Sequence, residues 1–177
     1  MTRAVEADLR QFSSEIPCVI SPHPLFDNYS VPVSRAEAIV RLKLCPADRF
    51  ILFFGFIREY KGLDLLLKAM AEQCVRDLGV KLIVAGEFYE NEKTYFDLIH
   101  EHELADRIII HSHFIGDEEV KYYFSAASLV VQPYRSATQS GVTQVAYYFN
   151  KPMVVTNVGG LAEIVPDGRC GYVVEPD

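Results

Sequence analysis

The sequence lacks the features that mark secreted and membrane-spanning proteins. Its four cysteines are far apart and form no Cys-x-x-Cys pair, so we expect reduced thiols and no disulfide framework. No apolar run approaches the ~20 residues that cross a bilayer, and the first residues lack the apolar core of a secretory signal. We therefore expect a cytoplasmic protein without a transmembrane segment, whose full-length form can lie peripherally at the inner face of the membrane.

Positive charge and the common catalytic motifs are also scarce. The 24 acidic residues outnumber the 17 Lys and Arg, for a net charge of −7, which argues against a general nucleic-acid binder. There is no Walker P-loop, no G-x-G-x-x-G fingerprint and no G-x-S-x-G elbow. His111 and His113 alternate at the end of a predicted strand, but no third ligand or acidic cluster accompanies them, so we expect no metal site.

Short apolar runs alternate with helical patterns from residue 50 onward. Such continuous runs are typical of strands that are buried on both faces of a sheet. Between two of them, apolar residues at spacings of three and four predict one helix with a shared face, formed by Leu63, Leu66, Leu67, Met70 and Cys74. The alternation predicts an α/β fold, a Rossmann-like doubly wound parallel sheet of about six strands with helices on both faces. The six runs are residues 51–54, 82–85, 108–110, 129–131, 153–155 and 172–174.

The first fifty residues have a different pattern. A polar helical pattern at Val5 to Phe12 precedes a short apolar run, and Ser34 is placed to cap a helix from Arg35 to Leu44 that Pro46 ends. We interpret residues 1–30 as the remnant of a preceding domain with its connector, and residues 31–177 as the α/β domain. The chain stops after its last predicted strand without a closing helix, as expected of a domain cut from a longer protein.

The loop from Gly55 to Gly62 is the first candidate site. Ligands of open parallel sheets bind outside the carboxyl ends of the strands. Gly55 permits a close turn there, and Arg58 and Lys61 place two cations near the start of the next helix. Fixed cations beside free backbone amides form a site for phosphate. A solvated basic loop explains the same residues equally well when they are taken alone.

Two later loops have similar candidates. Small and hydroxylated side chains are concentrated in residues 133–142, at the start of a predicted helix. They leave several backbone amides exposed, which predicts a second binding site for a diphosphate or a sugar hydroxyl. The alternative is an ordinary helix start that Ser140 or Thr138 caps. The loop at residues 157–163 has a Gly-Gly turn followed by Glu163, for which a capping role is at least as good an interpretation.

Together, these loops resemble the C-terminal, donor-binding domain of GT-B glycosyltransferases, specifically the retaining family 4. The resemblance covers roughly residues 18–177, and its strength comes from several spaced motifs in the right order. The motifs are Gly55 to Gly62, Val84-Ala85-Gly86-Glu87, Pro133-Tyr134, Lys151 to Val165, Asp167-Gly168, and Gly171 to Val174.

The resemblance implies a role for each of these loops. Arg58 and Lys61 would be the catalytic cations, neutralising the diphosphate of a nucleoside-diphosphate sugar without a metal or cofactor. The other donor-binding residues would be Gly55, Gly86 and Glu87, His113, Phe114 and Ile115 at the nucleobase, and Gln139, Ser140, Gly141, Val142 and Gln144 at the sugar and phosphates. The acceptor, a glycan or a lipid-linked molecule, would bind an N-terminal GT-B domain that this chain lacks, so the chain alone should be inactive.

The sequence departs from the family pattern at two positions. The family places two glutamates eight residues apart, the second of which holds the donor ribose, and the corresponding residues here are Ala137 and Val145. Gln144 or Gln139 would have to substitute by hydrogen bonding. Two other functions therefore stay open: a non-catalytic module that binds nucleotide sugars, and a plain α/β interaction domain.

Overall fold

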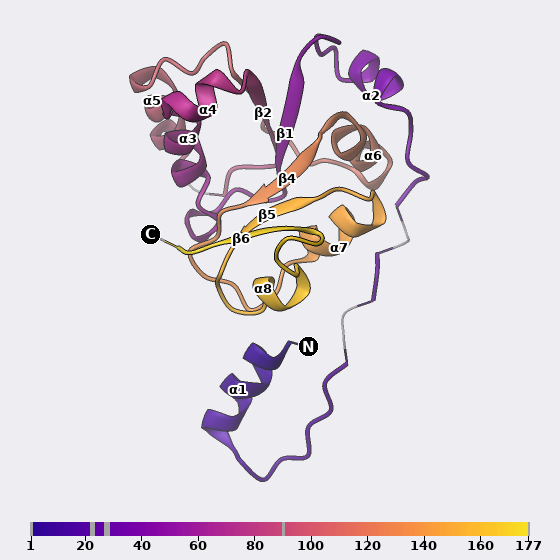
Figure 1. Cartoon of the computed structure of the whole chain (residues 1–177), viewed down its shortest axis with the longest axis vertical. Coiled ribbons are helices and arrows are strands. Elements are labelled where there is room, and N and C mark those ends of the chain that lie inside the picture. The colour runs from indigo at the N-terminus through magenta and orange to yellow at the C-terminus, as the bar shows by residue number, and fades with distance from the viewer. Residues whose placement is uncertain (1, 22–23, 27–28, 90, 177) are drawn as a thin grey trace.

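A six-stranded parallel sheet forms the centre of the computed structural model, which describes residues 2–21, 24–26, 29–89 and 91–176. Its strand order is β3-β2-β1-β4-β5-β6, and every neighbouring pair is parallel. Figure 1 shows the sheet with helices on either side. The strands are β1 (Arg49–Phe54), β2 (Val80–Ala85), β3 (Ile108–His111), β4 (Leu129–Gln132), β5 (Met153–Thr156) and β6 (Gly171–Val174).

The predicted doubly wound α/β fold is confirmed. All six apolar runs lie within strands, because continuous apolar side chains bury both faces of a parallel ladder. The chain adds β2 and β3 on one side of β1 and then returns to add β4, β5 and β6 on the other. The helices are α1 (Arg3–Phe12), α2 (Arg35–Arg41), α3 (Leu63–Ala71), α4 (Gln73–Asp77), α5 (Lys93–Glu101), α6 (Asp117–Ala126), α7 (Gly141–Tyr148) and α8 (Leu161–Ile164).

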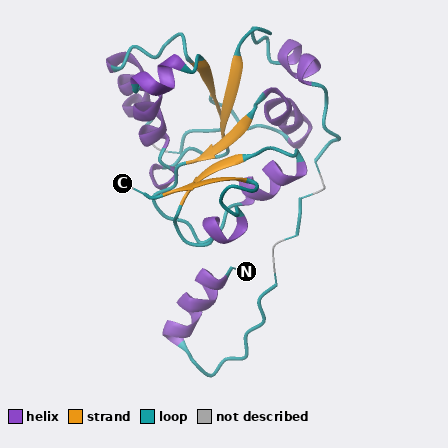
Figure 2. Ribbon diagram, in the orientation of Figure 1, coloured by secondary structure: helices purple, strands orange, loops and turns teal. Residues whose placement is uncertain are grey.

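The sheet separates two hydrophobic cores. One core joins α2, α6, α7 and α8 to one face, with Phe50, Phe124 and Val145 among its buried side chains. The other joins α3 and α5 to the opposite face around Phe53 and Leu67. In Figure 2, α3 and α5 lie on one side of the strands and α2, α6 and α7 on the other, while α1 stands apart below. None of the helices in the described ranges is long and apolar enough to cross a bilayer.

One half of the sheet is covered on a single face in the described part of the chain. The register places Val131, Val154 and Tyr172 side by side on the face that α7 and α8 do not cover. Tyr172 is 65% exposed. A groove of about 480 Å³ lies along this face, between α3 and the last residues of the chain, with Val131, Val154 and Val174 in its lining. Helices thus cover both faces of the half with β1, β2 and β3, and one face of the other half.

Two details of the predicted helices were wrong. The helix predicted to run to Leu44 ends at Arg41, where Lys43 turns the chain with a φ of 55°. Cys74 does not share the face of α3, because Glu72 adopts an extended conformation and ends that helix. Cys74 instead lies exposed in the short helix α4. Apolar spacing did not detect this break, since the spacing continues across it.

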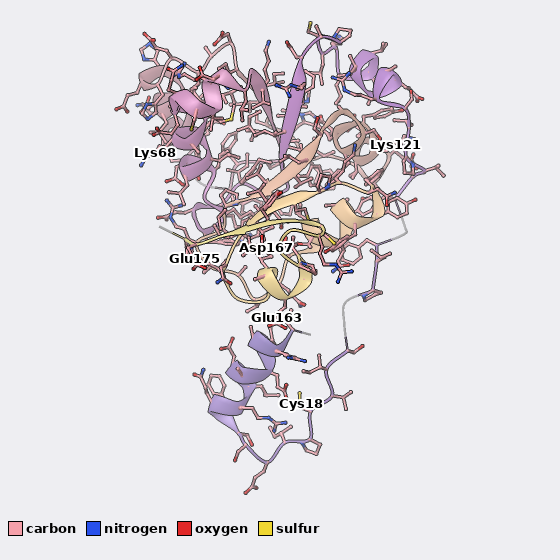
Figure 3. The ribbon with its side chains drawn as sticks, in the orientation of Figure 1. Cys18, Lys68, Lys121, Glu163, Asp167 and Glu175 are labelled. Carbon is pink, nitrogen blue, oxygen red and sulfur yellow. The ribbon has the colours of Figure 1, made fainter. Side chains whose placement is uncertain are left out.

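The amino-terminal helix is tied to the sheet domain through its first turn. Figure 3 shows Glu163 on α8 facing the start of α1. The Glu163 carboxylate accepts hydrogen bonds from the amides of Arg3 (2.8 Å) and Ala4 (2.9 Å), as the unpaired donors of a helix start require. Thr2 is buried against Gly160, where an added Cβ would lie 2.3 Å from the Thr2 methyl carbon. Glu163 was expected to cap or complement the dipole of its own helix; α8 has no side-chain cap, and the carboxylate instead binds the first amides of α1.

The loops that follow β1 and β4 touch at Gly62, and this contact generates a prediction about stability. Gly62 has a φ of +69°, and a Cβ there would lie 2.0 Å from the Pro133 carbonyl oxygen. Gly79 has a similar φ of +62° but nothing within 4 Å of its added Cβ. Gly79→Ala should therefore cost about 1 kcal/mol from backbone strain alone, whereas Gly62→Ala should cost about 3 kcal/mol or more.

Urea denaturation of both variants measures the two free energies of unfolding. Because the backbone conformations match, the difference between the variants reports the contact between the two loops. Equal losses in Gly62→Ala and Gly79→Ala would show that the loops do not pack backbone to backbone at this point.

Candidate functional site

The candidate site lies where the sheet changes its direction of growth, between β1 and β4. The loops after β1 and β2 are joined there by their backbones. The Ile57 amide donates to the Glu87 carbonyl at 2.8 Å, and the Tyr89 amide donates to the Ile57 carbonyl at 3.1 Å. Gly86 passes so close that an added Cβ would lie 2.2 Å from the Gly55 carbonyl oxygen. The predicted residues Gly55, Gly86 and Glu87 are thus brought together.

Lys61 is the buried cation of the site. Its residue is only 9% exposed, at the end of the short 3₁₀ turn Glu59–Lys61. The Nζ atom lies 3.2 Å from the position of a Cβ built on Gly55, and 5.8 Å from the centre of the Tyr134 ring. No carboxylate lies within ion-pair distance of Lys61 in the described ranges. The ammonium group therefore lies between Gly55 and Tyr134 without a carboxylate from the described residues to balance its charge.

Burial and a like charge act together on Lys61. Desolvation lowers the pKa of Lys61 to about 8, and the Arg58 guanidinium adds to the lowering. Both causes disfavour the charged form. A bound anion would act in the opposite direction, because it would neutralise two cations that now repel each other. The solvated basic loop that the sequence allowed does not describe Lys61, which is buried.

Arg58 lies at the outer rim of the same loop. It is exposed, and its Cζ atom stacks 4.5 Å from the centre of the Tyr89 ring, which follows β2. This cation–π contact gives the guanidinium a fixed direction without neutralising its charge. The site thus holds one buried and one exposed cation on the same turn.

The start of α7 completes the site from the side of β4. Ser140 occupies the position that caps α7, but its side chain makes no capping hydrogen bond. Its hydroxyl instead lies 3.3 Å from the hydroxyl of Tyr134, whose pKa burial raises to about 12. Val142 approaches the site, with its Cγ2 atom 3.6 Å from a Cβ built on Gly55. The side chain of Ser140 therefore does not cap the first amides of α7.

A pocket of about 210 Å³ adjoins the glycines and contains five of the predicted residues. Hydrophobic side chains dominate its wall, and Phe114 is 63% exposed. Sequence reasoning missed Tyr29, Phe56 and Asp117, of which Tyr29 comes from the irregular segment before α2 and carried no motif. The lining is Gly55, Gly86, Glu87, Phe114 and Ile115, together with Tyr29, Phe54, Phe56, Asp117 and Val120.

Other predicted residues lie apart from this pocket. His113 is exposed with its ring 6.1 Å from that of His111, and His111 Nδ1 lies 2.7 Å from the Tyr123 hydroxyl. Burial, with His113 as a second cause, lowers the pKa of His111. Among the residues that the structure describes, no three His, Cys, Asp or Glu side chains gather as metal ligands.

The region around the start of α7 holds the remaining predicted residues. Gln139 is exposed and Gln144 is buried, and neither lines the 210 Å³ pocket. A Cβ built on Gly141 would lie 3.1 Å from the Phe26 ring, so the amino-terminal segment covers this helix start. Ala137 packs its carbonyl against Gly159, and Val145 is buried in the first core. The two positions that carry glutamates in the resembling family are thus apolar and structural here.

The fold and the arrangement of these loops agree with the comparison to known families. The chain belongs to the family described as glycosyl transferases group 1, whose model matches residues 48–177. A relative from Segniliparus rotundus, named D-inositol 3-phosphate glycosyltransferase, is 32% identical over 147 residues, which are 81% of this chain and 32% of the relative. A protein of the same name from Thermobifida fusca is 31% identical over 81% of this chain and 35% of its own length. The chain thus spans about a third of these relatives.

Solved structures show the same fold. A sucrose-phosphate synthase from Thermosynechococcus elongatus matches with a TM-score of 0.82 at 24% identity, over 100% of this chain and 44% of the other. The Anabaena protein Alr3699/HepE, solved in complex with UDP and glucose, matches with a TM-score of 0.74 at 22% identity, over 99% of this chain and 48% of the other.

The lowered pKa of Lys61 predicts a cost to stability. Its folded pKa is about 8 against a reference value of 10.5, so at pH 7 the folded state holds an unfavourable charge that costs roughly 1–3 kcal/mol. Lys61→Met should therefore raise the free energy of unfolding at pH 7 by that amount. Between pH 8 and pH 10.5 the unfolded state binds more protons at this site, so the wild type gains stability as the pH rises.

Urea denaturation at pH 7 and pH 10 tests both parts of this prediction. The advantage of Lys61→Met should be largest at pH 7 and should shrink by pH 10. Lys68→Met, on the exposed part of α3, serves as the control and should change stability little at either pH. A Lys61→Met variant that is less stable than the wild type at pH 7 would contradict the electrostatic account.

Proposed function

We propose that this chain is the donor-binding, C-terminal domain of a retaining GT-B glycosyltransferase of family 4. The observation that carries the proposal is a buried ammonium group, Lys61, which lacks an anionic partner in the described chain and faces the junction of three strand-end loops. Membership of the glycosyl transferases group 1 family supports the same assignment. The ligand with the matching chemistry is the diphosphate of a nucleoside-diphosphate sugar.

The two cations give the site a role in the reaction. When the bond between sugar and phosphate breaks, negative charge grows on the departing nucleoside diphosphate. Lys61 and Arg58 interact more strongly with this charge than with the intact donor, so they lower the barrier. The amides at the start of α7 add further donors to the phosphates. In this proposal the protein supplies the neutralising charge, and the transfer needs no metal and no cofactor.

The adjoining pocket is suited to the nucleoside. Gly55 and Gly86 contribute backbone to its lining, and Phe114 offers an exposed ring for a planar base. The bound UDP in the Alr3699/HepE structure supports a nucleotide as the ligand class. Gln139, Ser140, Gly141, Val142 and Gln144 complete the proposed donor-binding set around the sugar and the phosphates.

The proposed organisation assigns the acceptor to another part of the protein. Residues 1–30 would be the remnant of the N-terminal GT-B domain and its connector, and residues 31–177 the nucleotide-sugar-binding domain. The acceptor, a glycan or a lipid-linked molecule, would bind the N-terminal domain. This chain alone would then bind the donor without transferring the sugar, and the whole protein would work in the cytoplasm, peripherally at the inner face of the membrane where the acceptor is lipid-linked.

A second candidate is a nucleotide-sugar-binding module without catalysis. Ala137 and Val145 favour it, because neither supplies the carboxylate that the resembling family places at that position. Sugar transfer by the full-length protein separates the two candidates, since a module would bind the donor and release it unchanged.

Nucleotide binding is the direct test of both candidates. Calorimetric titration of the wild type with UDP, GDP and ADP should show binding of at least one, and Lys61→Met should weaken it by about 10- to 100-fold, the loss expected for a charge-assisted contact to phosphate. Affinity should also fall as the pH rises through about 8, where free Lys61 loses its proton.

Lys68→Met is the matched control, because it removes a nearby lysine of α3 that does not line the pocket with Gly55. Its affinity should equal that of the wild type. Absence of binding by all three nucleotides would favour the plain interaction domain. Equal losses of affinity in Lys61→Met and Lys68→Met would show that Lys61 acts only through the net charge of the protein.

A further inference from the structure

Arg135 joins the two loops that flank the candidate phosphate site. Its two terminal guanidinium nitrogens donate to the two oxygens of the Asp64 carboxylate, at 2.7 and 2.6 Å. The same side chain donates to the Glu59 carbonyl at 2.9 Å, and its backbone amide donates to the Tyr60 carbonyl at 2.7 Å. Arg135 follows β4, whereas all three partners lie in the turn and helix that follow β1.

The turn that carries Lys61 has little structure of its own. It comprises three residues, closed by the bonds from the Lys61 amide to the Arg58 carbonyl and from the Gly62 amide to the Glu59 carbonyl. Such short 3₁₀ turns have poor hydrogen-bond geometry. Arg135 supplies hydrogen bonds to the carbonyls of the two residues immediately before Lys61. The position of the Lys61 side chain therefore depends on a residue of the opposite loop.

Arg135 does not reach the pocket itself. Its side chain lines a separate groove of about 620 Å³, together with Glu59, Asp64 and Lys68. Neither Lys61 nor Gly55 lines that groove. Arg135 thus acts on the phosphate site through the turn rather than through contact with a ligand.

We propose that Arg135, held by Asp64, is the positioning residue that keeps the Lys61 ammonium buried over Gly55. The proposal deepens the proposed function and depends on it for its consequence in nucleotide binding. A guanidinium fork is suited to this role, because it bonds a carboxylate and a backbone carbonyl at once in one plane. Without the fork, the turn would relax outward and Lys61 would exchange its buried position for solvent.

The electrostatic surroundings of Lys61 decide which variant isolates this effect. The charged or titratable groups around the turn are Arg58, which lowers the pKa of Lys61, Tyr134, whose ring centre lies 5.8 Å from Nζ, Glu59 of the turn itself, and the Arg135–Asp64 pair bonded to the turn. Replacing Arg135 alone would leave the Asp64 carboxylate unpaired and would change the net charge beside the turn. The double variant Arg135→Met with Asp64→Asn removes one charge of each sign. A change in the pKa of Lys61 in this variant therefore reports a change in the position of the Lys61 side chain.

The experiment measures the pKa of Lys61 and the nucleotide affinity in the same proteins. NMR titration of ¹³C-labelled lysine gives the pKa without any ligand, with the Lys61 signal identified by its loss in Lys61→Met. Calorimetry at pH 7 gives the affinity for UDP, GDP and ADP. The control is the double variant Asp48→Asn with Lys81→Met, which removes a partly exposed ion pair of 2.7 Å at the start of β1 and β2.

In the Arg135 and Asp64 double variant, the pKa of Lys61 should rise by about one unit or more toward 10.5. The affinity for the nucleotide that binds should fall about tenfold. The control variant should leave both quantities unchanged at a similar loss of thermal stability. Arg135→Lys should give an intermediate pKa, because an ammonium group cannot bond Asp64 and the Glu59 carbonyl as a planar fork does.

A Lys61 pKa that stays within about 0.2 units of the wild type in the double variant, with an affinity within twofold, would overturn the positioning role. Failure of the wild type to bind any nucleotide would refute the proposed function, and the pKa measurement would still decide the role of Arg135. Unchanged affinity in the double variant, beside a loss in Lys61→Met, would refute the inference alone.

Discussion

The close packing of Gly62 on Pro133 is the constraint on which the rest of the site depends. The loops after β1 and β4 meet backbone to backbone there, at a distance that leaves no room for a Cβ. Glycine at this position lets the 3₁₀ turn lie against the opposite loop, which places Lys61 beneath Tyr134 and over Gly55. The hydrogen bonds of Arg135 to Asp64 and to the Glu59 carbonyl then stabilise the turn in this position.

Lys61 shows a conflict between folding and function. A buried ammonium group without a partner weakens the folded state, and a well-packed apolar side chain would be the more stable choice at pH 7. The same unbalanced charge strongly attracts an incoming anion. Such tension is typical of functional sites, and it distinguishes Lys61 from Lys93, whose exposed side chain pairs with Asp97 at 2.6 Å.

Much of the fold followed from the sequence, because each strand is a continuous apolar run. The meeting of Gly55, Gly86 and Ile115 was predictable because each follows a parallel strand, and the carboxyl ends of parallel strands lie at one edge of the sheet. Burial of Lys61 was not predictable, since the loop from β4 causes it. The Arg135 contact with Asp64 joins residues 71 positions apart, and neither has a local pattern that reveals the other. The roles of Arg58, Lys61 and the other candidate residues in donor binding stay predictions.

The pairing of β1 with β4 has a mechanical consequence. In the described sheet these strands pair at Ile51 with Leu129 and at Leu52 with Val130, whereas β1 pairs with β2 along six positions. The two halves of the sheet therefore share a short seam, which lies directly before the loops that form the candidate site. A diphosphate held by Lys61 on one side and by the start of α7 on the other would bridge this seam. The ligand would then serve as a brace that stiffens the sheet where its own backbone ladder is shortest.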